Sequence, residues 1–341
     1  MYCGSDVASL FGEWGTGQAG DVSVSLLKPG LFGSDDYMAL TMGSHVQKCK
    51  ELYGWSENRQ TASLAIAGQR LGGEQYWALK FRNSTLEDED LAGNPTCVTP
   101  GKAVFASSLI HRATWDTRES TAIPGPGMAL RITNELCVPI LPSSSGVNQV
   151  VGMTGNNQYR YHKCQVEGKS VVALGSGLTL QTDLNAGFLR SLAGDDSNMA
   201  IFAPDRFYLG GPHPIRGFVA SAFGRKAAQD GNISDALSGG GTAFLTGSAL
   251  LRYPLQFGVL GNLNAHVQGF VNAGSLQTGC IPKPSTAWKN LVGDLQPAVG
   301  VGMVVPMSGQ GRIEFNLSRP MGATPKDMVQ PFQLNMSVDW L

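Results

Sequence analysis

The side chains with the widest chemical repertoire are five histidines and six cysteines, and their spacing matches no common catalytic or metal-binding motif. The histidines are His45, His111, His162, His213 and His266, and the cysteines are Cys3, Cys49, Cys97, Cys137, Cys164 and Cys280. No histidine pair has the spacing of a helical zinc-protease motif, and no cysteine pair has that of a redox or zinc site. Phosphate-binding loops and serine nucleophile turns are also absent from the sequence. We therefore predict a protein that is not an enzyme and that holds no metal and no cofactor.

One segment, RFYLGGPHPIRGF from Arg206 to Phe218, concentrates unusual residues. Its 13 residues include three glycines, two prolines and two arginines. Glycine allows backbone angles that other residues avoid, and proline removes a hydrogen-bond donor, so this composition is typical of a loop. Arg216 lies inside it, between Ile215 and Gly217. If the loop is buried, Arg216 needs a polar or acidic partner, because an unpaired buried charge is costly.

Alternation of apolar and polar residues dominates the rest of the chain. At the C-terminus, for example, Phe332, Leu334 and Met336 alternate with Gln333 and Asn335, which places them on opposite faces of a strand. No segment has a convincing long helical period. The predicted strands are 3–13, 21–29, 35–45, 61–69, 75–84, 103–116, 126–137, 158–174, 178–189, 242–255, 263–274, 295–307, 311–320 and 331–341.

This pattern favours a transmembrane antiparallel β-barrel of about 14–16 strands, in which short turns alternate with long loops. Only 15% of the residues are charged, and the polar faces carry mainly uncharged side chains. Aromatic residues lie near predicted strand ends, as in the interfacial girdles of such barrels: Trp77, Trp115, Tyr253 and Trp340. The alternative is a soluble β-sandwich or soluble barrel, which also alternates.

Several of these segments resemble motifs of the BamA/Sam superfamily of outer-membrane protein insertases and transporters. Members carry an (I/V)-R-G-(F/Y) tetrad on a loop that folds into the barrel lumen, and Ile215–Phe218 matches it. GFVNAG at 269–274 resembles the family's F-x-D/N-x-G strand motif, and VGVGMVVPMSGQGRIEFNLSRPMG resembles its penultimate hairpin. The lead-in of Asp205 and Arg206 with FYLGG is most similar to the mitochondrial branch, the barrel subunit of the sorting and assembly machinery.

The resemblance implies a site made of loop, inner wall and gate. The loop-motif residues would be Gly210, Gly211, Ile215, Arg216, Gly217 and Phe218. The inner-wall partners would be Asn272, Gly274 and Glu314; Asn272 is the neutral partner expected for Arg216 from the motif, and Glu314 could supply a charge. A lateral gate would form where the last strand meets the first, with the last strand contributing Gln333, Leu334, Asn335, Met336, Ser337 and Val338.

The function implied by the resemblance is insertion and assembly of β-barrel precursor proteins in the mitochondrial outer membrane. The partners would be precursor proteins, accessory subunits of an assembly complex and membrane lipids, and the net charge of −1 gives no reason to expect nucleic acid. We expect an N-terminal segment at 1–20 that includes a weak first strand, a barrel domain at 21–341, and no soluble POTRA module. The alternative function is a polypeptide-translocating or passive outer-membrane pore of the same superfamily.

Overall fold

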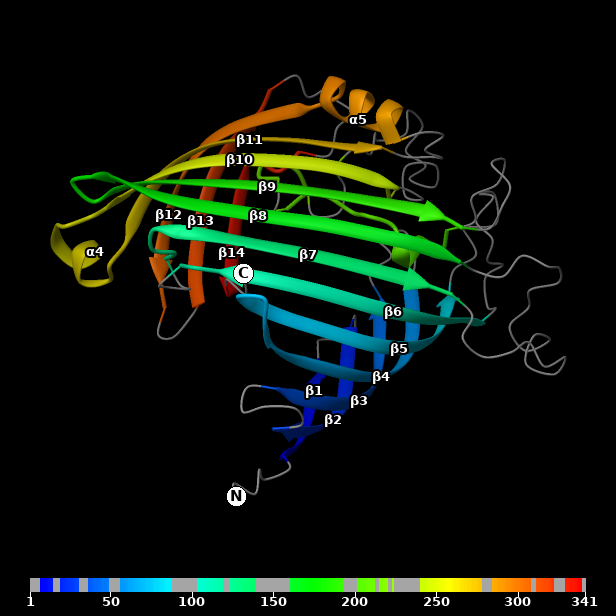
Figure 1. Cartoon of the computed structure of the whole chain (residues 1–341). Coiled ribbons are helices and arrows are strands. Elements are labelled where there is room, and N and C mark those ends of the chain that lie inside the picture. Colours follow the sequence, from blue (N-terminus) through cyan, green and yellow to red (C-terminus); the bar gives the residue numbers. More distant parts are fainter. Residues whose placement is uncertain are drawn as a thin grey trace, which may run out of the picture. The chain divides into compact units, whose positions relative to one another are not determined.

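A 14-stranded antiparallel sheet is the framework of the protein, with the strands neighbouring one another in sequence order (Figure 1). The computed structural model describes residues 7–14, 19–30, 36–48, 56–87, 103–118, 123–138, 160–192, 201–211, 215–219, 223, 240–277, 284–307, 311–321 and 329–338. The strands are β1 Val7–Trp14, β2 Ala19–Pro29, β3 Tyr37–Lys48, β4 Ser56–Arg70, β5 Gly73–Glu87, β6 Ala103–Asp116, β7 Gly127–Cys137, β8 Tyr161–Gly175, β9 Leu178–Ser191, β10 Ala243–Pro254, β11 His266–Gln277, β12 Gln296–Pro306, β13 Gly311–Pro320 and β14 Phe332–Val338. The predicted antiparallel all-β fold is confirmed.

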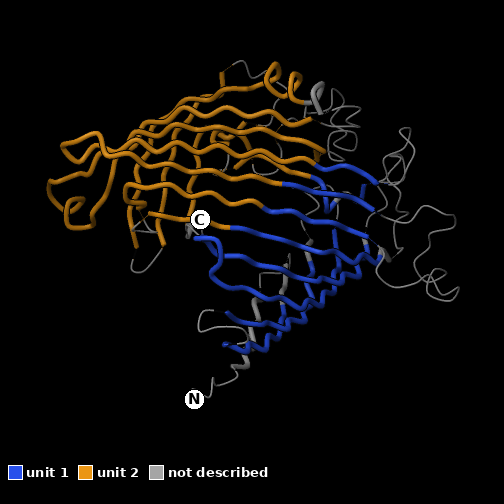
Figure 2. The backbone as a smooth tube through the Cα atoms, in the orientation of Figure 1, with its two compact units in different colours: residues 1–113, 133–164, 189–206 blue, residues 114–132, 165–188, 207–341 orange. Residues whose placement is uncertain are grey.

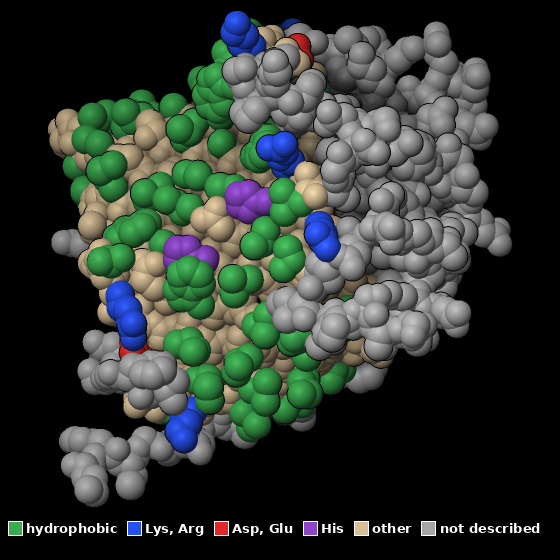
Figure 3. All heavy atoms as spheres, turned by 45° about the vertical axis from the view of Figure 1, so that its right-hand side comes forward, with side chains coloured by type: hydrophobic (Ala, Val, Ile, Leu, Met, Phe, Trp, Pro, Cys, Tyr) green, Lys and Arg blue, Asp and Glu red, His purple; other side chains and the backbone are tan. Residues whose placement is uncertain are grey.

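The sheet buries polar side chains on one face and exposes apolar side chains on the other. On β13, Arg312, Glu314 and Asn316 are at most 2% exposed, whereas Leu317 is 59% exposed. Figure 3 shows apolar side chains spread over one face of the molecule, with few charged groups among them. A soluble β-sandwich has the opposite arrangement, since it packs its apolar faces together. An apolar outer face and a polar inner face are typical of membrane β-barrels.

Two compact units divide the described strands between them (Figure 2). Unit 1 consists of residues 1–113, 133–164 and 189–206, and unit 2 of residues 114–132, 165–188 and 207–341. Unit 1 contains β1–β5, and unit 2 contains β10–β14. The Ile-Arg-Gly-Phe tetrad and its predicted wall partners all belong to unit 2.

Among the described residues, short α-helices lie in two of the connections, and a 3-10 helix, Ala203–Asp205, lies between β9 and β10, although the sequence showed no helical period. Helix α4, Gly258–Asn262, joins β10 to β11, and α5, Pro284–Gly293, lies between β11 and β12. Leu291 of α5 packs on Ala243 and Leu245 of β10. Ten residues that bury so little apolar surface leave no periodic pattern to detect. Within the described ranges, no helix is long and apolar enough to span a membrane.

Candidate functional site

The tetrad Ile215–Phe218 is buried in unit 2. Ile215, Arg216 and Phe218 are 0%, 1% and 2% exposed, although they belong to a loop. Gly217 has a φ of +98°, a left-handed conformation that glycine adopts without strain. The tetrad is therefore fixed by contacts with the strands around it.

Arg216 pairs with a carboxylate on the polar face of β13. Its Nη2 donates a hydrogen bond to Oε2 of Glu314 at 3.0 Å, and neither side chain is more than 1% exposed. Arg312 Nε donates to the other carboxylate oxygen, Oε1, at 2.7 Å. The Arg216 guanidinium also lies 5.1 Å from the ring centre of Phe270, at a distance that allows a cation–π contact. Glu314 thus pairs with two buried arginines, one from the loop and one from its own strand.

Asn272, the partner expected from the motif, binds the backbone of the tetrad rather than the guanidinium. Its Nδ2 donates to the carbonyl oxygen of Arg216 at 3.4 Å. The charged partner of Arg216 is Glu314, the wall residue that we expected could supply a charge. Asn272 therefore binds the backbone of Arg216, and Glu314 binds its side chain.

Gly274 provides the space that Ile215 occupies. A Cβ atom built on Gly274 would lie 1.9 Å from Cδ1 of Ile215 and 3.4 Å from Cγ2 of Thr246. Real Cβ contacts are never that short, so any side chain at position 274 must displace Ile215. Because Ile215 adjoins Arg216, that displacement would also disturb the pair with Glu314.

We expect Gly274→Val to undock the tetrad. Overpacking a buried site typically costs about 1–3 kcal/mol, and we expect faster proteolysis of the 206–219 segment in folded protein. Gly269→Val is the matched control, because it lies on the same strand and its Cβ would meet no atom within 4 Å. Limited proteolysis followed by mass spectrometry measures the cleavage rate of this segment in both variants. Equal cleavage of the two variants would contradict the role of Gly274.

The loop backbone is also bound to the last strand and to the residues before it. Gln333 of β14 accepts a hydrogen bond from the Gly217 amide at 3.1 Å and donates one to the Phe218 carbonyl at 2.8 Å. The amide of Gln330 donates to the Gly217 carbonyl at 2.8 Å, and Phe218 forms a β-bridge with Val329. The sequence assigned Gln333 to a gate; the structure shows it in contact with the loop.

Hydrogen bonds extend this site across the polar face of unit 2. Arg252 of β10 donates to Gln181 at 2.8 Å and to Gln268 at 3.1 Å. Gln268 donates to Asn316 at 2.9 Å, and Asn316 donates to Glu314 at 3.3 Å. Side chains of β9, β10 and β11 are thereby connected to Glu314, the Arg216 partner on β13. Within the described residues, no three His, Cys, Asp or Glu side chains are grouped to hold a metal ion.

The remaining predicted loop glycines lie at a turn before the tetrad. Gly210 and Gly211 have φ values of +114° and +92°, which only glycine adopts readily. The Gly211 amide donates to the Phe218 carbonyl at 3.0 Å, so the segment closes on itself. These two glycines therefore bring the lead-in residues next to the tetrad.

The predicted gate residues all belong to β14, the last strand of the order. Leu334 and Met336 are 61% and 67% exposed on the apolar face, while Asn335 is half-buried on the polar face. Ser337 and Val338 pair in register with Arg312 and Gly311 of β13. Their side chains lie outside the described part of the structure, as does Trp340.

A second buried ion pair, which the sequence analysis missed, anchors the lead-in of the loop in unit 1. Both Nη atoms of Arg82 on β5 donate to the carboxylate of Asp205, at 2.5 and 2.7 Å. The Arg82 guanidinium also lies 5.5 Å from the ring centre of Phe202, and Lys163 of β8 donates to the Asp205 carbonyl at 2.9 Å. A bidentate arginine–carboxylate pair fixes orientation as well as distance. The segment before RFYLGG is therefore held by contacts separate from those of the tetrad.

Comparison with known proteins identifies the family. The model of the Omp85 superfamily domain matches residues 8–340. The chain belongs to the Omp85 superfamily. A SAM50-like protein of Schizosaccharomyces pombe is 29% identical over 238 residues, which are 69% of this chain and 44% of that protein. The human sorting and assembly machinery component 50 homolog is 28% identical over 228 residues, 65% of this chain and 43% of that protein.

A solved structure supports the same fold. The crystal structure of BamA from Haemophilus ducreyi lacking POTRA domains 1–3 matches with a TM-score of 0.68 at 15% identity, covering 93% of this chain and 61% of that one. The aligned part of this Omp85 chain corresponds to less than half of the curated relatives it matches. The predicted barrel fold class and family resemblance are thus confirmed.

Proposed function

We propose that this chain inserts and assembles β-barrel precursor proteins in the mitochondrial outer membrane. Membership of the Omp85 superfamily and similarity to sorting and assembly machinery components of yeast and vertebrates support this proposal. The apolar outer face and buried polar face support an integral membrane location. The proposed function makes and breaks no covalent bonds, and we propose that the protein is not an enzyme.

The proposed mechanism uses the two end strands of the order as a lateral gate. β1 and β14 are the first and last strands among the described residues, and the described part of β14 has seven residues. A strand edge presents unpaired backbone groups to which an extended segment of a precursor can add by β-augmentation. Each added strand would then provide the edge for the next, while lipids and accessory subunits surround the growing barrel.

The single observation that carries this mechanism is the contact of Gln333 with the tetrad. Gln333 bonds to the backbone of Gly217 and Phe218, while the neighbouring side chains of β14 face the apolar side. The docked loop therefore holds the polar face of β14, the proposed gate strand. In this mechanism the Arg216–Glu314 pair keeps β14 ordered as a template, rather than acting on the precursor directly.

Reconstitution tests the proposed function against the pore alternative. Liposomes that contain the protein should assemble a labelled β-barrel precursor into a protease-resistant form faster than protein-free liposomes. Ion conductance is recorded on the same preparation. Conductance without any acceleration of assembly would contradict the insertase and favour the pore.

A further inference from the structure

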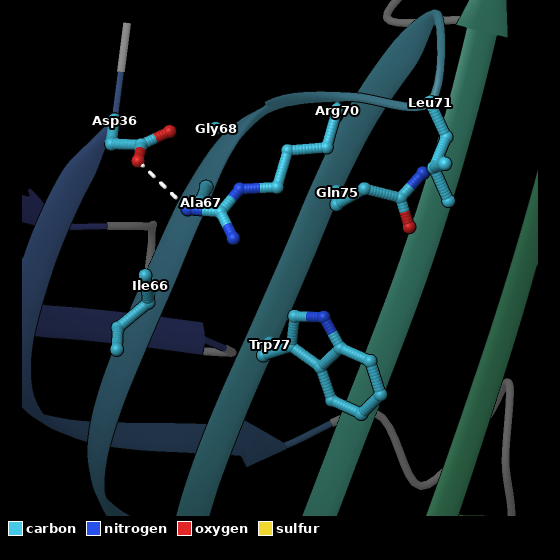
Figure 4. Close-up of a pocket in the computed structure, with 8 residues that line it drawn as sticks. All are labelled: Asp36, Ile66, Ala67, Gly68, Arg70, Leu71, Gln75 and Trp77. Carbon is cyan, nitrogen blue, oxygen red and sulfur yellow. Dashed lines mark hydrogen bonds and ion pairs between the residues drawn. The ribbon is translucent and has the colours of Figure 1, made fainter. Parts of the chain in front are cut away.

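A pocket of about 580 Å³ lies on the apolar face of unit 1, at the end of the β4–β5 hairpin (Figure 4). Its lining residues are Asp36, Ile66, Ala67, Gly68, Arg70, Leu71, Gln75 and Trp77. Trp77 and Arg82 are an odd number of residues apart on β5, so they lie on opposite faces of that strand. The pocket is therefore on the face away from the Arg82–Asp205 pair and outside the site described above.

The end of the pocket nearest the turn carries an ion pair. Nη2 of Arg70 donates to Oδ2 of Asp36 at 2.9 Å, the contact drawn as a dashed line in Figure 4. The Arg70 side chain is 59% exposed and Asp36 only 9%, so the remaining guanidinium donors are accessible. A Cβ on Gly68 would lie 1.8 Å from Oδ1 of Asp36, so only glycine leaves room for this carboxylate. The rim thus offers N–H donors at no net charge.

The amide of Gln75 closes the wall of the pocket beside Arg70. Its Oε1 lies 3.1 Å from Nε2 of His111. Its Nε2 is buried, so this atom is not open to a ligand in the pocket. The hydrogen-bond donors that the pocket offers are therefore those of Arg70.

The other end of the pocket is apolar. Ile66 and Trp77 are register partners on β4 and β5, and the Trp77 ring stacks on His111 at a centroid distance of 4.0 Å. Ile66 is four residues from Arg70, which is roughly 13 Å along a strand. The pocket therefore passes from polar donors at a strand end to an apolar wall further inside. This order of polar and apolar surface matches the change from headgroup to hydrocarbon in a bilayer.

We propose that this pocket binds one zwitterionic glycerophospholipid. Its phosphate accepts hydrogen bonds from the exposed N–H groups of Arg70. One acyl chain lies along Ile66 and Trp77. The Arg70–Asp36 pair is neutral overall, so a headgroup with a net negative charge gains no additional attraction. The bound lipid would lie against Asp36, which precedes β3, and against the β4–β5 turn.

Native mass spectrometry of the full chain in non-ionic detergent tests this proposal by titration with dioleoylphosphatidylcholine. Wild type should bind one lipid tightly, and Arg70→Gln should weaken that binding about tenfold, the effect of losing a charge-assisted hydrogen bond. Arg319→Gln is the matched control, since it removes an exposed arginine from β13 in unit 2. Arg70→Lys should recover part of the affinity.

Two comparison lipids define the specificity. Dioleoylglycerol, which has the same acyl chains and no phosphate, should bind at least about tenfold more weakly, and dioleoylphosphatidylglycerol should bind no more tightly than the choline lipid. The proposal is overturned if dioleoylglycerol binds as tightly, if the anionic lipid is strongly preferred, or if Arg70→Gln binds like wild type. Circular dichroism of each variant checks that the strands have formed.

Discussion

Glu314→Gln is expected to destabilise the protein by about 3–5 kcal/mol, the effect of breaking a buried ion pair by removing one partner. The substitution keeps the shape of the side chain but leaves Arg216 and Arg312, both nearly fully buried, beside a neutral amide. Gln268 and Asn316 connect Arg252 to the same carboxylate, so its loss would extend to a third buried arginine. Urea unfolding in detergent micelles, followed by tryptophan fluorescence, measures the change in the free energy of unfolding.

Glu167→Gln is the matched control for that experiment. Glu167 pairs with Arg131 at 3.4 Å in the same unit, but the two side chains are 26% and 23% exposed. Solvated pairs of this kind contribute about 0–1 kcal/mol. Equal unfolding free energies for the two variants would show that Glu314 is not the balancing charge of the site.

Asp205→Leu is expected to cost about 3–5 kcal/mol as well, because it leaves the buried Arg82 without its bidentate carboxylate. The side chains of Arg82 and Asp205 are 8% and 7% exposed. Since Asp205 immediately precedes RFYLGG, we also expect the segment 201–207 to become accessible to protease. Urea unfolding and limited proteolysis measure the two effects.

The double variant Arg82→Met/Asp205→Leu separates the charge pair from simple packing. Replacing both ions of a buried pair by apolar side chains is often neutral or stabilising. We therefore expect the double variant to be more stable than Asp205→Leu alone. If the loss of stability in the double variant equals the sum of the losses in Asp205→Leu and Arg82→Met, the pair contributes no coupling energy. Other contacts would then hold the loop lead-in.

Alternation in the sequence was sufficient to locate all 14 strands but not their ends. Strands predicted at 35–45 and 61–69 extend to Tyr37–Lys48 and Ser56–Arg70 in the structure, where they pair over twelve positions. The added residues, such as Gln47, Lys48 and Glu57, are polar on both faces of the strand. Periodicity depends on a contrast between faces, so it has no signal where a strand extends beyond the apolar zone.

The site was predictable where it depended on register and was missed where it depended on contacts distant in sequence. Glu314 falls on the polar face of β13 by simple alternation, and the structure places it on Arg216. The Arg82–Asp205 pair joins residues 123 positions apart, and neither belongs to the tetrad. The contact of Gln333 with the Gly217 amide spans 116 positions. Only the three-dimensional path of the loop brings such residues together.

The most direct test of the central claim compares precursor assembly by wild type and Arg216→Ala in liposomes. The claim is that the docked tetrad keeps β14 ordered as an edge for incoming strands. We expect Arg216→Ala to reduce the assembly rate at least about tenfold, corresponding to the loss of roughly 1.4 kcal/mol of stabilisation, while Arg131→Ala on the same unit assembles at the wild-type rate. If a folded Arg216→Ala variant assembles the precursor as fast as wild type, the docked loop is not needed for insertion and the account is wrong.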